Sequence, residues 1–118
     1  MILVDTSVWV NHLRRTGSPL AARLEAGDVL CHPYVIGEIS LGLLKRRTEV
    51  IALLASLPSA PVVSHDDAMA FVDRRGLAGR GIGWIDVHLA ASAVVSGARL
   101  WSDDRRLAEI ARDLRIAP

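Results

Sequence analysis

Carboxylates follow two short segments that are predicted to be strands, the wholly apolar residues 2–4 and residues 99–101 (Arg-Leu-Trp). Asp5 comes immediately after residues 2–4, and Asp103 and Asp104 come just after residues 99–101. An uninterrupted apolar run of this length is typical of a strand that is buried on both faces, as in a parallel sheet. Ligands of such sheets bind at the carboxyl ends of the strands. These acids are therefore candidates for one site, although Asp5 could instead cap the helix that follows it.

Two further carboxylates lie on segments that are otherwise apolar. Glu38 falls inside a helix predicted over residues 33–44, and Asp86 lies near the start of a strongly apolar helix predicted over residues 84–95. A carboxylate on an apolar face is costly unless it is neutralised, paired or bound to a metal ion. Each acid also has a structural explanation. The helix dipole favours an acid in the first turn, where Asp86 lies, and Glu38 could pair with an arginine.

The acids at positions 5, 38, 86 and 103–104 together predict a site for a divalent cation. Clustered carboxylates repel one another and raise one another's pKa, so a cation is their natural partner. Ligands that are all oxygen favour Mg²⁺ or Mn²⁺, and no pair of the four histidines has the spacing of a zinc site. A bound cation of this kind could lower the pKa of a water molecule and hold a phosphoryl group for in-line displacement.

Strand and helix patterns alternate along the chain, which predicts an α/β fold with a central, mainly parallel sheet of four to five strands. The predicted strands are residues 2–4, 29–32, 60–64 and 99–101, with a marginal fifth strand at Ile116. The predicted helices are residues 7–13, 20–26, 33–44, 48–57, 65–75, 84–95 and 103–114, with a turn at residues 16–19. Ser102 is expected to cap the last helix.

Composition points to a single domain over residues 1–118, since half of the chain (51%) is hydrophobic. No apolar run approaches the roughly 18 residues of a membrane span, and the lone Cys31 fits a reducing cytoplasm.

The net charge of +1 gives no general attraction to polyanions. Arginine outnumbers lysine thirteen to one, which suits a phosphate-bearing partner or reflects genome composition alone. The helical face of Val50, Ile51, Leu53 and Leu54 exceeds the needs of one small core, which predicts a homodimer.

The acidic motifs resemble those of PIN-domain ribonucleases, and the size and start of the chain look most like VapC toxins of bacterial toxin–antitoxin pairs. Four segments in the same order carry the resemblance: residues 4–7 (Val-Asp-Thr-Ser), 35–42 around Glu38, 85–93 beginning Ile-Asp, and 100–107. Each motif alone is weak, and together they span nearly the whole chain. The resemblance implies a PIN-like three-layer α/β/α fold.

The resemblance also implies a function. It suggests a Mg²⁺-dependent (or Mn²⁺-dependent) endoribonuclease that acts on tRNA or ribosomal RNA through a metal-activated water, forms a homodimer in the cytoplasm and is inhibited by a VapB-type antitoxin. The metal ligands carried over by motif are Asp5, Glu38, Asp86 and a terminal acid. The family pattern of hydroxyl residue, any residue, acid maps onto Ser102 and Asp104, but the doubled acid keeps Asp103 as a candidate. The positions expected to support the metal-bound water are Ser7 and Ser102.

Arg80, Arg105 and Arg106 are the candidate phosphate contacts, since Arg80 lies in a glycine-rich loop and the other two follow the terminal acids. Two alternatives remain open. A phosphorylatable signalling receiver has a similar size and acid-lined sheet, but this chain has one acid after its first strand and its sole lysine, Lys45, in the wrong place. A catalytically inactive PIN-like RNA-binding module would be expected to lack one of the four acids, and none is lost.

Overall fold

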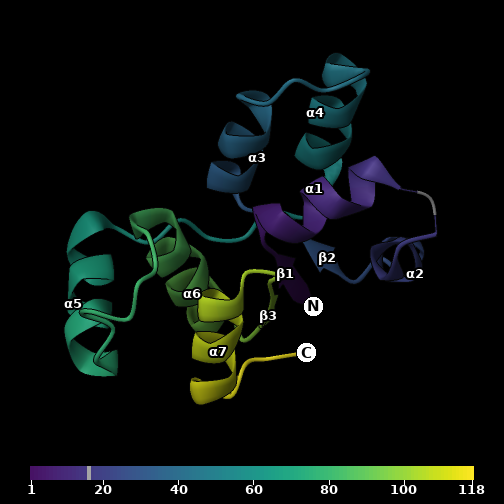
Figure 1. Ribbon diagram of the computed structural model, residues 1–118. Coiled ribbons are helices and arrows are strands. Elements are labelled where there is room, and N and C mark those ends of the chain that lie inside the picture. Colours follow the sequence, from purple (N-terminus) through teal and green to yellow (C-terminus); the bar gives the residue numbers. More distant parts are fainter. Residues whose placement is uncertain (16) are drawn as a thin grey trace.

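Three parallel strands lie between helices in the computed structural model, which describes residues 1–15 and 17–118 (Figure 1). The central strand is β1 (Ile2–Val4), flanked by β2 (Val29–Leu30) and β3 (Arg99–Trp101). Both neighbours pair with β1 in parallel. The predicted turn at residues 16–19 includes Thr16, which lies outside the described residues. The helices are α1 (Thr6–Arg14), α2 (Pro19–Glu25), α3 (Pro33–Ser40), α4 (Arg47–Ser56), α5 (His65–Arg75), α6 (Trp84–Ser96) and α7 (Arg105–Asp113).

The central position of β1 follows from its composition. Ile2, Leu3 and Val4 are all buried, because helices cover the sheet and neighbouring strands occupy both edges of β1. α6 packs against β1 and β3, and α7 packs against β3. The predicted α/β fold with a parallel sheet is therefore confirmed.

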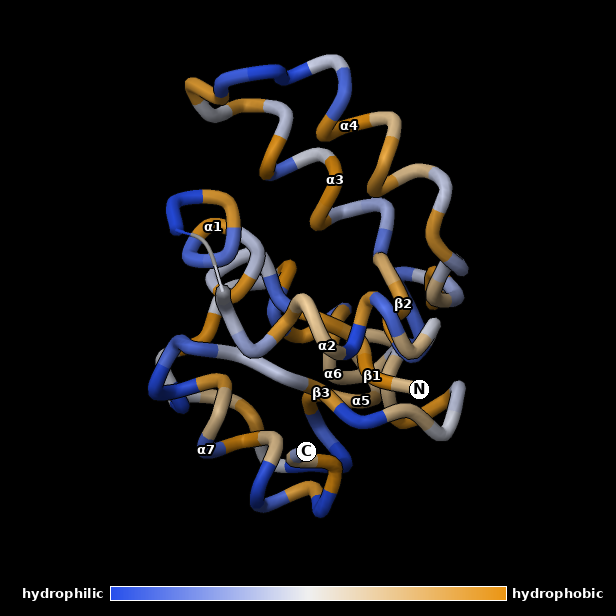
Figure 2. The backbone as a smooth tube through the Cα atoms, turned by 90° about the vertical axis from the view of Figure 1, so that its right-hand side faces the viewer, coloured by the Kyte–Doolittle hydropathy of each residue, from blue (hydrophilic) through white to orange (hydrophobic). Residues whose placement is uncertain are grey.

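Helices lie on both sides of the small sheet. Figure 1 shows α5, α6 and α7 on one side and α1, α2, α3 and α4 on the other. The pair formed by α3 and α4 extends away from the sheet in both Figure 1 and Figure 2. This pair carries Glu38 on α3, so one of the four acidic positions belongs to an element that reaches outward from the sheet.

The two helices that flank β3 show why the sequence places them there. α6 is apolar almost all round and is buried continuously from Val87 to Ala93, as its sequence predicts. α7 instead has one apolar stripe, and it buries Leu107, Ile110 and Ala111 while its charged residues face water. In Figure 2 this alternation appears as orange and blue segments along α7. Both helices therefore fix the chain on either side of β3.

The predicted number of strands is wrong, because within the described residues the sheet has three strands rather than four or five. The segment 60–64 forms no strand, and its neighbourhood keeps only one parallel bridge between Cys31 and Ser59. Pro58 and Pro61 flank that bridge, and neither has an N–H to extend a ladder. Ile116 accepts one backbone bond from Leu100 N–H (2.8 Å) but forms no strand, since the chain bends at Arg115 (φ +60°).

Two helical predictions also need correction. α3 ends at Ser40, not at Leu44, and the chain then runs irregularly to Arg46, whose φ is +54°. The prediction that the apolar face of α4 exceeds the needs of the core is wrong as well. Leu54 is buried, and Val50 and Ile51 pack against the core. Leu53 is the member of that face that remains exposed, so a dimer cannot be argued from this helix. No helix among the described residues combines the length and apolar character needed to cross a membrane.

Candidate active site

The buried carboxylate of Asp5 lies at the carboxyl end of the central strand. Its residue occupies the N-cap position of α1, yet its side chain makes no capping bond. Its Oδ2 instead accepts two hydroxyl hydrogen bonds, from Ser7 Oγ (2.7 Å) and Ser102 Oγ (2.7 Å). Asp5 is only 5% exposed, so these two bonds replace water around a buried charge. The structure thus favours a site residue over a helix cap.

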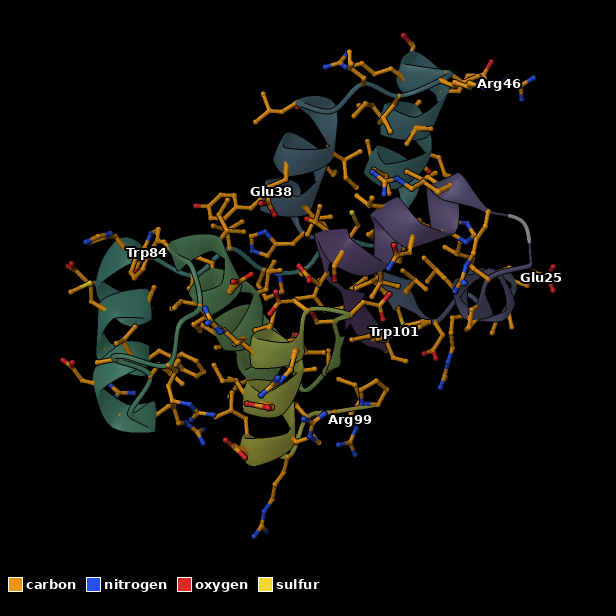
Figure 3. All side chains as sticks on the ribbon, viewed as in Figure 1. Glu25, Glu38, Arg46, Trp84, Arg99 and Trp101 are labelled. Atoms are coloured by element: carbon orange, nitrogen blue, oxygen red, sulfur yellow. The ribbon has the colours of Figure 1, made fainter. Side chains whose placement is uncertain are left out.

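Hydroxyl groups tie the ends of β1 and β3 together. Ser7 and Ser102 lie 3.4 Å apart, oxygen to oxygen, and Ser7 Oγ also accepts the backbone N–H of Asp103 (3.0 Å). Ser102 Oγ accepts the N–H of Asp104 (3.0 Å). The two predicted supporting serines are therefore brought together around Asp5. In Figure 3 Arg99 and Trp101 mark the two ends of β3, and Trp101 is at the end nearer Glu38.

Glu38 comes from α3 and reaches the same region through α1. Its Oε1 accepts a hydrogen bond from Thr6 Oγ1, the residue after Asp5 (2.7 Å). The glutamate is exposed, which corrects the expectation of a carboxylate on a covered face. That expectation failed because the neighbouring Leu41 and Gly42 are exposed too, so this side of α3 has no protein packed over it.

Asp86 is the acid whose pKa is affected by the charges of the other acids. Its Oδ2 accepts the N–H of Gly83 (3.0 Å), which closes the first turn of α6. Burial raises the pKa of Asp86 above its ordinary value, while the Gly83 bond opposes the rise. The negative charges of Asp5, Asp104 and Glu38 raise this pKa further. The four acids that the sequence selects therefore lie close enough to interact electrostatically.

The doubled acid separates into two different environments. The side chain of Asp104, not Ser102, caps α7, because its Oδ1 accepts the N–H of Leu107 (3.0 Å). The expectation that Ser102 would cap this helix is thus wrong, since the Ser102 hydroxyl is donated to Asp5. Asp103 points to α1 instead, where its Oδ2 accepts Asn11 Nδ2 (2.8 Å).

The three candidate phosphate contacts gather beside two of the acids. Arg80, Arg105 and Arg106 line one cavity of about 440 Å³ together with Asp86 and Asp104. Each arginine is held by a surface interaction: Arg80 pairs with Asp113 (2.7 Å), Arg105 with Glu109 (3.4 Å), and Arg106 Nη1 donates to the Gly81 carbonyl (3.3 Å). Exposed pairs of this kind contribute little stability, so the guanidinium groups can exchange them for an incoming phosphate at small cost.

The donor set fits a hard divalent cation. Every side-chain donor is an oxygen, and within residues 1–15 and 17–118 none of the four acids forms an ion pair with a protein cation. In that same part of the chain no three acidic, histidine or cysteine side chains already form a closed metal-binding group. The acids are thus assembled as neighbours, and a cation would have to draw their oxygens together.

Sequence reasoning missed two polar residues of α1, Thr6 and Asn11, that contact the acids. Thr6 binds Glu38, and Asn11 binds Asp103. A signal for Asn11 was available, because it lies four residues after Ser7 and so shares that face of the helix. Thr6 had no such signal, since its partner lies 32 residues away.

The PIN domain profile matches residues 2–113 of the chain. Ribonuclease VapC32 of Mycobacterium tuberculosis (strain H37Rv) is 51% identical over 108 residues, which cover 91% of this chain and 87% of that protein. Ribonuclease VapC11 of the same strain is 36% identical over 128 aligned positions, covering 95% of this chain and 92% of that protein.

A solved structure shares the fold. The crystal structure of PAE2754 from Pyrobaculum aerophilum superposes with a TM-score of 0.63 and covers 92% of this chain and 83% of that one. The two sequences are 20% identical, so this likeness speaks for the arrangement of strands and helices alone.

Proposed function

Because the chain belongs to the PIN-domain family, among the VapC-type ribonuclease toxins, we propose that it is a Mg²⁺- or Mn²⁺-dependent endoribonuclease that hydrolyses tRNA or ribosomal RNA. One observation carries the proposal. The charges of Asp5, Glu38 and Asp104 all act on half-buried Asp86, and these acids form no ion pair with a cation in the described part of the chain. A bound divalent cation would offset this mutual repulsion in the working enzyme.

The acids and the serines of the site have different roles in this proposal. Asp5, Glu38, Asp86 and Asp104 would hold the cation, and the hydroxyls of Ser7 and Ser102 orient Asp5 by occupying its Oδ2 (Ser102: 2.7 Å). A divalent cation supplies Lewis acidity, which lowers the pKa of a nearby water molecule and offsets charge on a phosphodiester. Ser7 lies in α1 and Ser102 directly follows β3, so the arrangement of Asp5 depends on both α1 and the end of β3.

The arginines provide the phosphate contacts in this proposal. Arg80, Arg105 and Arg106 border the cavity that Asp86 and Asp104 also line, so a phosphate held by guanidinium groups there would lie beside the acids. Bidentate binding would fix the place of one phosphate over the site. Cleavage would then depend on a backbone position, and the base sequence would be read elsewhere.

The proposed partner is a cognate VapB-type antitoxin. A second cavity, of about 410 Å³, is bordered by Thr6 and Glu38 at one side and by Leu43, Arg14 and Lys45 among its other residues. Leu43 is fully exposed, so this cavity offers apolar surface to a partner segment. A protein segment bound there would cover Glu38 and prevent the cation site from forming.

We also propose a homodimer, and we place the enzyme in the cytoplasm with its RNA substrates. The support for the dimer lies between α3 and α6. Tyr34, Leu41 and Trp84 are exposed large apolar side chains, and they border one cavity of about 460 Å³. Aromatic side chains on a surface of this kind are typical of interface centres.

The decisive experiment measures RNA cleavage with Mg²⁺, with Mn²⁺ and with excess EDTA, for the unaltered protein and for Asp5→Asn. Cleavage should occur with either metal, should stop in EDTA, and should be lost in the variant while its fold is kept. Undiminished cleavage in EDTA would refute the metal requirement. Binding of RNA without any cleavage would instead favour an inactive PIN-like module. Sequencing the new RNA ends after brief expression identifies the RNA and the bond that is cut.

A further inference from the structure

We propose that Asn11 is a positioning residue that splits the doubled acid: it anchors Asp103 to α1 so that Asp104 alone enters the acidic site. This inference rests on the proposed metal-dependent function and concerns how one ligand of that site is selected. Asn11 lies in the second turn of α1 and is exposed, and Asp103 is exposed as well. Neither residue is needed to fill the core, so their contact calls for another explanation.

The anchor consists of two hydrogen bonds from the same helix. Asn11 Nδ2 donates to Asp103 Oδ2 (2.8 Å), and Ser7 Oγ accepts the backbone N–H of Asp103 (3.0 Å). Ser7 and Asn11 are one helical turn apart, so both bonds come from one face of α1. Together they hold both the main chain and the side chain of Asp103 against α1.

The next residue is directed the opposite way. Asp104 lines the cavity that contains Asp86 and the phosphate-contact arginines, and its charge acts on Asp86. Asp103 lines a separate, small cavity of about 60 Å³ beside Asn11 and Trp101. The side chains of Asp103 and Asp104 therefore line different cavities, and the bond to Asn11 is the contact that holds Asp103 at the smaller one.

A swap of the two side chains tests the inference. Asn11→Asp sets two carboxylates against each other at hydrogen-bond distance, which should push Asp103 away and disturb Asp104. Asn11→Asp combined with Asp103→Asn restores a donor and an acceptor in reversed order. We expect the single change to weaken binding of Mn²⁺ alone by about tenfold and to lower kcat by a similar factor, with KM little changed, as the loss of one charge-assisted bond implies.

The double variant should recover to within about threefold of the unaltered protein, since one hydrogen bond again joins the two positions. Asp103→Asn alone should keep Mn²⁺ affinity, because its amide oxygen can still accept from Asn11. Asp66→Asn, which removes one exposed charge from α5, serves as the matched control and should change neither quantity. Thermal melting of the Asn11 and Asp103 variants should change little, because the contact is exposed and stabilises the fold little.

Each outcome decides between distinct conclusions. Loss of Mn²⁺ binding in Asp103→Asn and in the double variant would make Asp103 a metal ligand and overturn the inference. Unchanged Mn²⁺ binding and kcat in Asn11→Asp would overturn it too, since the contact would then position nothing. An unaltered protein that neither binds Mn²⁺ nor cleaves RNA would refute the proposed function itself, and that failure is recognisable before any variant is compared.

Discussion

Protonation of His32 should destabilise the protein in mild acid, because this buried side chain joins α3 to α6. Its Nδ1 accepts the N–H of Tyr34 (3.0 Å), which caps α3, and its Nε2 lies 3.1 Å from Ser92 Oγ on α6. The Ser92 hydroxyl already donates to the Pro61 carbonyl (2.6 Å), so Nε2 must carry the proton and donate. The neutral ring satisfies both neighbours. A second proton, on Nδ1, would oppose the N–H of Tyr34.

The size of the effect follows from the pKa. Burial lowers the pKa of His32 from 6.5 to about 4, with a further contribution from the charge of His88. In the unfolded chain the ring takes up a proton near its ordinary value, whereas in the folded protein it does so only near pH 4. Above the ordinary value both states are neutral and stability is unaffected. As pH falls through this window the free energy of unfolding should decrease by about 3 kcal/mol, at about 1.4 kcal/mol per pH unit.

The assay is urea denaturation at about pH 7.5 and about pH 4.5 for the unaltered protein and for His32→Asn. Asparagine can still cap α3 but does not titrate in this range, so the variant shows what all other groups contribute. The unaltered protein should lose about 2–3 kcal/mol more than the variant between the two conditions. Equal losses would show that His32 is not held neutral by the fold and would refute the assigned tautomer.

Three other predictions concern the acidic site and the dimer. Asp86→Asn should abolish cleavage and make the metal-free protein more stable near pH 7, with no gain near pH 3. The raised pKa of Asp86 means that its charged form opposes folding, and in strong acid the group is neutral in both states. Lower melting temperatures at neutral pH would mark the acid as structural. Asp104→Ala should reduce cleavage at saturating Mg²⁺ at least about tenfold more than Asp103→Ala, as loss of a ligand exceeds loss of an anchor; the reverse order would move the ligand to Asp103. Light scattering at micromolar concentration should give a dimer mass that Trp84→Glu halves and Leu53→Glu leaves intact, and a monomer mass for the unaltered protein would contradict the proposed dimer.

The sequence predicted the fold best where one local pattern has one explanation. Residues 2–4 are wholly apolar, and only a strand with partners and helices around it buries them all. The apolar α6 and the single stripe of α7 were equally informative. The same reasoning selected Asp5 and the pair Asp103 and Asp104 as neighbours, because carboxyl ends of parallel strands meet at one edge of a sheet, but it could not choose between the two acids of the pair.

The remaining errors arose where local preferences allow several outcomes. Ser102, Asp103 and Asp104 are all good helix caps, so propensity cannot choose among them. Ser102 donates its hydroxyl to Asp5, which lies 97 residues away, and Asp104 therefore caps the helix. Likewise, the sequence does not show that α3 packs against α4, so the apolar residues of α4 looked more numerous than the core requires. Such contacts depend on the assembled structure.

The strand order gives this enzyme a particular sequence of assembly during synthesis. β1 is made first but lies between β2 and β3, so it must wait for both neighbours. The bond from Ser102 to Asp5 spans 97 residues, which at about 5–20 residues per second takes on the order of 5–20 s to synthesise. Ser7 can donate to Asp5 early, but until β3 and the start of α7 leave the ribosome, Ser102 and Asp104 cannot join the acids of the site. If Asp104 holds the cation as proposed, a growing chain is expected to gain ribonuclease activity only after the start of α7 has been made.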